Sequence, residues 1–311
     1  MELFWPLVVV RALHLWSLLA LFGASLFAIY GGSPPGGAET LGKLKVWLAG
    51  IALASGVGFV MALLVNMTEA VESLFSAARW QAFLLATGFG RVWLLRLVGL
   101  AILLLWVAGH RGGPNRGHAD AALGAALLVS LAWVGHAGAG EGADAFGGSL
   151  ALGCHVLAAG AWLGGLVPLS FALAKAGAGG DPEPLCHALE SFSRLGLAAV
   201  ALILASGILS AGLTMQGFGN LGRTPYGKVL VAKIALFAIL LAVAAANRFV
   251  FLRRLRRQTG PSQTEALTPI QCRAQTKIQI RALKRTIAAE HAIGLALVAL
   301  AAALSSLAPV D

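Results

Sequence analysis

Several side chains that could bind a metal ion lie within or beside long apolar stretches of the sequence. His14, His136 and His155 are each embedded in a run of hydrophobic residues, and Met215 ends another such run. Neutral imidazole is a common protein ligand for both Cu(I) and Cu(II), and a thioether is a soft ligand. These four residues are therefore the candidate metal ligands.

A second set of polar residues lies in the last two apolar stretches: Lys233, Asn247, Glu290 and His291. An ionisable side chain inside a membrane span costs free energy, so it tends to face the bundle interior and to have a role. A structural network that joins the ends of two helices and a route for a transported ion both fit this set. Lys233 could also extend its ammonium toward the membrane surface.

The elements that position these residues are membrane helices. The chain is 58% hydrophobic and only 12% charged, with a mean hydropathy of +0.82. A helix needs about 20 mostly apolar residues to cross the hydrocarbon core, and its backbone groups must be satisfied internally. The sequence thus predicts an all-α polytopic membrane helical bundle in a lipid bilayer.

Eight apolar runs are long enough to span. We expect transmembrane helices at 5–30, 44–67, 87–109, 119–138, 150–173, 194–215, 226–250 and 285–307. No internal repeat and no room for a sizeable soluble domain is found, so residues 1–311 are expected to form a single transmembrane domain. The first run lacks the basic flank and cleavage site of a signal peptide and is expected to be retained.

The basic residues fix the expected orientation. The net charge of +10 does not indicate nucleic-acid binding, because most of the excess lies between the last two helices, against the single acid Glu265. The positive-inside rule places this segment in the cytoplasm and both termini on the periplasmic side. The basic residues concerned are Arg248, Arg253, Arg254, Arg256, Arg257, Arg273, Lys277, Arg281, Lys284 and Arg285.

In this topology His136 and His155 flank the same external loop at matching depth. His14 is expected about 10 Å below the same surface, at 1.5 Å rise per residue, and could approach them if the first, fourth and fifth helices adjoin. Two or three histidines that converge at one depth would make a copper site. The alternative is that each is a separate interfacial or packing histidine.

Other residues give little support for further chemistry. His110, His118 and His187 are expected in or beside loops, where solvated histidine is the ordinary interpretation. The three cysteines form no CxxC or CxxCH pair, which argues against a thiolate metal cage and covalently attached haem. No nucleophile elbow, HExxH motif or P-loop is present, so we do not expect an enzyme.

Several segments together resemble the copper resistance protein D (CopD) family. The first helix contains RALHLWSLLALFG from Arg11, the third begins with TGFGRVWLLR from Thr87, and the fifth contains HVLAAGAWLGGL from His155. Also similar are GHA at 135–137, FSRLG at 192–196, TPYGKVLVAK at 224–233, the Asn247 and Arg248 pair, and Glu290. The order and spacing of these segments make the combined resemblance specific.

The resemblance implies an eight-helix inner-membrane protein that handles copper ions and moves them into the cytoplasm. Family members often carry an aspartate three residues before the fifth-helix histidine, whereas this chain has Leu152 there. The 311 residues contain no counterpart of the CopC-like domain fused to some relatives. A separate periplasmic CopC-like copper donor is therefore an expected partner.

Two other functions remain open at this stage. Histidines on facing helices could ligate haem axially, as in a transmembrane b-type cytochrome. The chain could also be a scaffold that inserts copper into a partner without copper flux. The sequence does not distinguish Cu(I) from Cu(II), and it does not set the direction of transport, its energy coupling or the oligomeric state.

Overall fold

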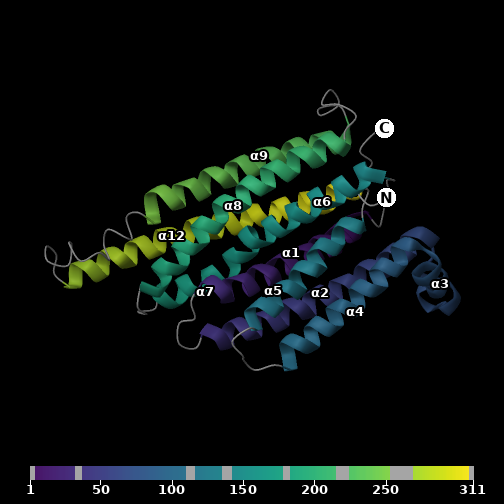
Figure 1. The fold of residues 1–311 in the computed structure, drawn as a ribbon, viewed down its shortest axis with the longest axis horizontal. Helices are drawn as coiled ribbons and strands as arrows, with labels where there is room; N and C mark the ends of the chain where they lie inside the picture. The colour runs from purple at the N-terminus through teal and green to yellow at the C-terminus, as the bar shows by residue number, and fades with distance from the viewer. Residues whose placement is uncertain are drawn as a thin grey trace.

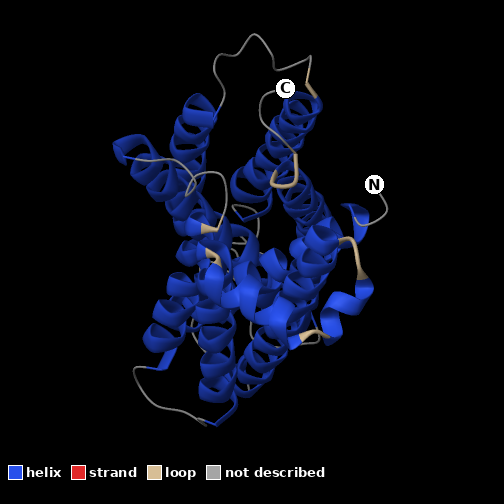
Figure 2. Ribbon diagram, turned by 90° about the vertical axis from the view of Figure 1, so that its right-hand side faces the viewer, coloured by secondary structure: helices blue, strands red, loops and turns tan. Residues whose placement is uncertain are grey.

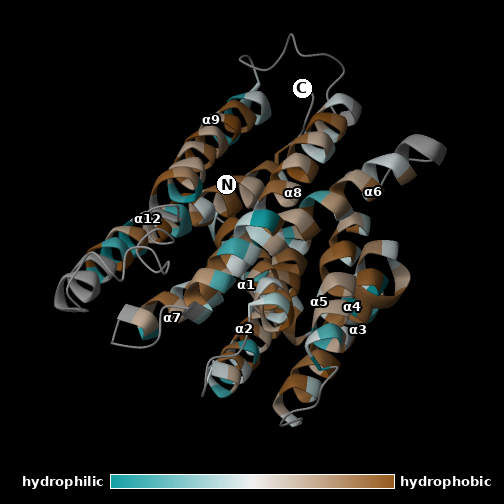
Figure 3. Cartoon of the chain, turned by 60° about the vertical axis from the view of Figure 1, so that its left-hand side comes forward, coloured by the Kyte–Doolittle hydropathy of each residue, from teal (hydrophilic) through white to brown (hydrophobic). Residues whose placement is uncertain are grey.

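The computed structural model contains helices throughout the part of the chain that it describes. These residues are 4–31, 37–109, 116–134, 142–177, 183–214, 224–252 and 269–307, and none of them forms a strand (Figure 2). The predicted all-α class is therefore confirmed. Apolar residues colour most of α9 and α4 brown in Figure 3, as expected for helices that face lipid.

The helices of the described residues follow one another along the chain. The long ones are α1 (Phe4–Tyr30), α2 (Gly37–Thr68), α4 (Gly88–Gly109), α6 (Gly142–Ala159), α8 (Glu183–Thr214), α9 (Pro225–Ala246) and α12 (Pro269–Leu304). Helices α5 (Arg116–Val129) and α7 (Gly165–Gly177) are shorter, and α5 continues into the 3-10 turn η3 (Ser130–Trp133).

Two π-helical segments interrupt or extend the long helices. The segment η5 (Gly160–Gly164) joins α6 to α7, so that these three pieces form one continuous rod. The segment η7 (Asn247–Leu252) extends α9 at its carboxyl end. Such π segments are rare and occur often at functional sites, because they change which residues face a neighbouring helix.

Seven helical stretches are long and apolar enough to cross a membrane: 4–30, 37–68, 88–109, 146–176, 184–212, 225–250 and 277–304. Each corresponds to a predicted span. The eighth predicted span, 119–138, is not among these seven stretches. Its described part, 119–134, belongs to α5, which has 14 residues, and to the 3-10 turn that follows at Ser130; residues 135–138 lie outside the described part of the chain.

Several helix boundaries differ from the prediction. Helix α12 begins at Pro269 rather than 285, and α8 begins at Glu183 rather than 194. The segment 68–86, between two predicted helices, contains η1 (Val71–Phe75), α3 (Ala77–Gln81) and the π segment η2 (Ala82–Ala86). Apolar length identifies only the part of a helix that lies in hydrocarbon, so polar extensions outside it are missed.

Helix α1 is the centre of the bundle. It contacts α2, α5, α7, α12 and η5, and it begins at the end of the molecule where α12 finishes (Figure 1). The amino end of α1 and the carboxyl end of α12 therefore lie at the same end of the bundle. The close approach of η5 to α1 depends on glycine, because a Cβ on Gly164 would lie 1.9 Å from the carbonyl oxygen of Leu19.

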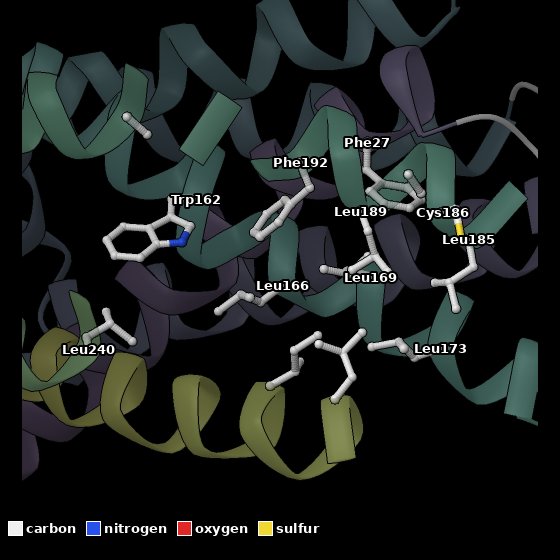
Figure 4. Close-up of a cluster of buried hydrophobic side chains, with 14 of the residues drawn as sticks. Phe27, Trp162, Leu166, Leu169, Leu173, Leu185, Cys186, Leu189, Phe192 and Leu240 are labelled. Carbon is white, nitrogen blue, oxygen red and sulfur yellow. The ribbon is translucent and has the colours of Figure 1, made fainter. Parts of the chain in front are cut away.

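A large apolar cluster fills the carboxyl-terminal half of the bundle. Figure 4 shows the side chains of Trp162, Leu166, Leu169 and Phe192 gathered on one side of α12. Leu166 and Leu169 are almost fully buried. This cluster holds η5, α7 and α8 together above the part of α12 that carries Glu290.

Candidate functional site

His14 is buried in α1, with both ring nitrogens engaged. Its Nδ1 lies 2.9 Å from the carbonyl oxygen of Ala52 in α2, and its Nε2 lies 3.0 Å from Nη2 of Arg96 in α4. A carbonyl only accepts and a guanidinium only donates, so the ring is the neutral Nδ1–H tautomer. A metal ion could bind Nε2 only if Arg96 moved away.

Arg96 is itself fixed by α5 and η3. Its Nη1 donates to the carbonyl oxygen of Leu127 at 2.8 Å and to the hydroxyl of Ser130, and its guanidinium lies 5.1 Å from the centre of the Trp93 ring. No carboxylate among the described residues bonds this buried cation. His14 and Arg96 therefore join α1, α2, α4 and α5.

The expected neighbours of α1 are present, but the partners of His14 are not those expected. Helix α1 does contact α5 and η5, which belong to the predicted fourth and fifth spans. The polar contacts of His14, however, come from α2 and α4. No hydrogen bond joins His14 to His155, both of which lie in the described part of the chain.

His155 is half-buried in α6 and faces α8. Its Nδ1 lies 3.1 Å from the hydroxyl oxygen of Ser206, and that hydroxyl lies 2.5 Å from the carbonyl oxygen of Leu202. The hydroxyl proton is used on Leu202, so the Ser206 oxygen accepts a hydrogen bond from Nδ1–H of His155. The lone pair of the imidazole is then on Nε2. This is the arrangement of a metal-ligating histidine whose other nitrogen is held in place by a second residue.

Lys233 of α9 belongs to the same region. Ser206 lies eight residues before the end of α8 and Lys233 eight residues after the start of α9, so each is about 12 Å from its helix end at 1.5 Å per residue. Lys233 is therefore at about the same depth from the helix ends as Ser206, the partner of His155. A cation at this point opposes the binding of a second cation.

The remaining predicted metal ligands, His136 and Met215, lie outside the described residues. Within the described ranges, no group of three or more His, Cys, Asp or Glu side chains is arranged to hold a metal ion. Ser206 was not identified from the sequence. The pattern of a single serine in an apolar helix carries no signal until the facing helix is known.

The predicted link between the last two helices is present as a hydrogen bond. Nδ2 of Asn247 in η7 donates to Oε1 of Glu290 in α12 at 2.5 Å. Arg248 instead turns toward α8, where its Nη1 donates to the carbonyl oxygen of Ser193 at 2.7 Å and to the Ser193 hydroxyl. His291 points its Nδ1 at the carbonyl oxygen of Ile287, 3.0 Å away within α12.

Two cavities meet at Glu290. One has a volume of about 150 Å³ and is lined mainly by apolar residues of η5, α7, α8, α9 and α12, with Ser193, Asn247, Arg248 and Glu290 as its polar groups. The other, of about 10 Å³, lies between α1, η5 and α12 and is lined by Trp16, Gly164, Glu290 and His291, among others. Glu290 is thus a wall residue of both.

A second buried carboxylate lies in the amino-terminal half. Asp120 of α5 accepts a hydrogen bond and ion pair from Lys45 of α2 and a hydrogen bond from Nε1 of Trp106 at 2.9 Å, with Nε of Arg116 at 3.8 Å. The sequence analysis did not identify this cluster. Lys45 and Asp120 each lie near the edge of a predicted span, where a charged residue is ordinarily solvated.

Comparisons with known proteins identify similar chains. The family models described as "Copper resistance protein D-like, N-terminal domain" and "Copper resistance protein D" match residues 1–146 and 186–304. His14 and His136 lie in the first range, Met215 and Glu290 in the second, and His155 between them. No solved structure shows a significant match.

Three curated relatives are similar over much of the chain. The inner membrane protein YebZ of Escherichia coli K12 is 33% identical over 80% of this chain and 85% of its own length. Copper resistance protein D of Pseudomonas syringae pv. tomato is 27% identical over 78% and 81%, respectively. The copper transport protein CutJ of Bacillus subtilis 168 is 30% identical over 58% of this chain and 29% of its own. None of the three is named as an enzyme.

Proposed function

Because the chain belongs to the copper resistance protein D family and is a multi-pass protein of the bacterial inner membrane, we propose that it binds copper and moves it across that membrane. The proposed direction is import from the periplasm, which would contribute to copper homeostasis and resistance. The names of two relatives, a copper resistance protein and a copper transport protein, support a copper-related role.

The observation that carries this proposal is the arrangement of His155. Its Nδ1–H is held by Ser206 of α8, which leaves the lone pair of Nε2 for a metal ion. The serine takes the orienting role for which the family aspartate, replaced here by Leu152, would have been expected. His136 and Met215 are the proposed further ligands, and His14 joins them only in a state in which Arg96 has released its Nε2.

The proposed inward route follows the same rod toward Glu290. Trp162 of η5 comes seven residues after His155, about 10 Å further along at 1.5 Å per residue. Trp162 lines the larger cavity, and Glu290 lines the same cavity from α12. A metal ion bound by two or three histidines is held weakly enough to be released onward, which suits transport rather than storage.

A soluble periplasmic CopC-like protein is the proposed copper donor. Both chain ends are expected on the periplasmic side, where α1 begins and α12 finishes at the same end of the bundle (Figure 1). The outer half of the bundle, where His155 lies, would then receive the ion. This partner could be tested by transfer of copper from the purified donor to the membrane protein.

The deciding experiment is copper uptake into proteoliposomes by the native chain and by His155→Ala, under reducing and oxidising conditions to separate Cu(I) from Cu(II). We expect flux from the native chain and its loss in the variant. His118→Ala is the matched control, because His118 is an exposed histidine of α5 and its removal should leave flux unchanged.

The other outcomes identify the alternatives. Copper that binds without flux would support a scaffold that inserts copper into a partner. A Soret band in the purified protein would support a b-type cytochrome, although the hydrogen bonds at both nitrogens of His14 oppose axial ligation by that residue. Native uptake no faster than in protein-free vesicles would contradict transport.

A further inference from the structure

The two carboxylates that are buried among the described residues have opposite surroundings. Asp120 and Glu290 are 1% and 3% exposed, respectively. Asp120 faces the ammonium of Lys45, the guanidinium of Arg116 and the indole N–H of Trp106. Glu290 receives one recorded hydrogen bond, from the neutral amide of Asn247. Only Asp120 has its negative charge balanced by neighbouring cations.

No cation within the described ranges forms an ion pair with Glu290. From η7, the guanidinium of Arg248 lines the same cavity but donates to Ser193. From α12 itself, the ring of His291 faces a carbonyl oxygen. None of the residues that α1, η5 and α7 contribute to the two cavities beside Glu290 titrates near neutral pH: they are Trp16, Leu19, Ala20, Trp162, Leu163, Gly164, Leu166 and Leu169.

A buried carboxylate without a cation partner is costly in its charged form. A proton or a cation that arrives at the oxygen atoms removes that cost. Glu290 also has a path for such an exchange, because the cavity of about 150 Å³ beside it has room for several waters and has polar groups to bind them. One of these groups, Oδ1 of Asn247, is buried and has no hydrogen-bond partner.

The cavity extends toward the cytoplasmic side of the expected topology. Its wall includes Leu283 and Ile287, which precede Glu290 on α12, and Arg248, which begins the basic segment assigned to the cytoplasm. Water that enters from this side would reach Glu290 between α8 and the α9–η7 rod. On the other side of Glu290, the small pocket against α1 and η5 has room for about one water.

We propose that Glu290 is a proton-binding site that exchanges its proton with cytoplasmic water through this cavity. In the exchange the O–H bond of the carboxylic acid breaks, the proton passes to a cavity water and the carboxylate remains. The reverse step takes a proton from a hydronium ion. Asn247 donates to Oε1 in either form, so it positions the side chain while the proton enters or leaves.

Proton exchange at this position would link ion release to cytoplasmic pH, a link that rests on the proposed function. A cation that arrives in the cavity favours the carboxylate by electrostatic attraction, and a proton from the cytoplasm then neutralises the carboxylate and favours departure of the cation. The oxygen pair of Glu290 and Asn247 suits a proton better than a soft Cu(I) ion, which prefers nitrogen and sulfur ligands. Glu290 is therefore assigned to proton binding and not to the copper site.

Infrared difference spectroscopy on the native chain in lipid tests proton binding without any copper. A protonated carboxylic acid has a carbonyl band distinct from that of a carboxylate, and we expect such a band to appear as pH falls. It should be absent in Glu290→Gln and retained in Glu72→Gln, which makes the same change at an exposed acid of η1. Glu290→Asp should retain a band with a shifted midpoint.

A native chain with no titrating carbonyl band, or a band that persists in Glu290→Gln, would overturn the proposal. Copper-loaded proteoliposomes then test the link to transport, with internal and external pH varied separately. Native flux should depend on internal pH, and Glu290→Gln should lose that dependence while Glu72→Gln keeps it. Absence of native flux at every pH would count against the proposed function alone, because the infrared result does not depend on copper.

Discussion

The Nε2 atom of His14 lies 3.0 Å from Nη2 of Arg96, so the nitrogen that a metal would need is held by a guanidinium. The two residues lie 82 positions apart in the chain and connect α1 to α4. Arg96 also reaches α5 and η3 through Leu127 and Ser130. The Arg96 side chain thus occupies the Nε2 atom that a metal ion would need and also joins α1, α4, α5 and η3.

Replacing Arg96 with alanine should destabilise the bundle. The buried acceptors on His14, Leu127 and Ser130 would lose their donor, and an unsatisfied buried acceptor costs about 1–3 kcal/mol. Thermal unfolding in detergent should show a lower Tm than the native chain. Arg91→Ala is the control, because Arg91 is exposed on the same helix, and an equal effect of both changes would contradict this account.

Ser206→Ala should weaken copper binding without unfolding the protein. The change removes the acceptor for Nδ1–H of His155, and loss of a residue that orients a ligating histidine typically costs about tenfold to a hundredfold in metal affinity. Competition titration with a chelator measures the affinity. Ser210→Ala, one turn further along α8, should leave it unchanged, and native affinity in Ser206→Ala would show that His155 is not a ligand oriented in this way.

Lys233→Met should strengthen copper binding. Lys233 lies at about the same depth as Ser206, the partner of His155, and removal of its ammonium eliminates a repulsion between like charges, for which we expect roughly tenfold tighter binding, about 1.4 kcal/mol. The same titration applies. Lys228→Met removes a charge from an exposed position on α9 and should have little effect. Weaker binding in Lys233→Met would mean that the lysine supports the site.

Breaking the pair between Lys45 and Asp120 should lower the free energy of unfolding far more than breaking a surface ion pair of α2. Lys45→Met leaves a carboxylate that is 1% exposed without its main cation, and loss of one partner of a buried pair costs about 3–5 kcal/mol. Lys43→Met breaks the exposed Lys43–Glu39 pair, for which about 0–1 kcal/mol is expected. Chemical denaturation would compare the two, and similar losses would contradict the buried pairing.

Gly164→Ala should disturb the contact between η5 and α1. The added methyl group would meet the backbone of Leu19, which cannot retreat without moving α1, so we expect a loss of about 1–3 kcal/mol from overpacking. Gly50→Ala in α2 is the control, because a Cβ there meets nothing within 4 Å. Its unfolding transition should match that of the native chain or rise slightly.

The sequence was sufficient to predict where the helices lie, but not which polar side chains form contacts between them. Apolar length alone located α1, α4 and α9 to within a few residues, because the hydrocarbon core sets the length of a span. It missed the start of α12 at Pro269, since the added turns are basic and lie outside the apolar run. It also shortened α8, whose added first turns contain Glu183, His187 and Glu190 and likewise lie outside the apolar run.

For the candidate site, the sequence identified the polar residues inside apolar runs but not their hydrogen-bond partners. His14 and His155 were recognisable because a histidine in an apolar run is unusual, and Glu290 stood out in the same way. Their partners Arg96 and Ser206 lie 82 and 51 positions away. Such partners depend on which helices adjoin and how each is rotated about its axis, and a single sequence contains neither.

The π segment η5 lets the continuous helix of α6, η5 and α7 present different faces to its neighbours before and after Gly160–Gly164. A π turn accommodates one extra residue, and one residue corresponds to a rotation of about 100° around a helix axis. The half of the rod before Gly160 therefore directs His155 toward α8, while the half after Gly164 is turned so that α7 packs against α1 and α12. Deleting a single residue within 160–164 would rotate one half against the other and separate the proposed copper-binding surface from the proposed proton-binding one.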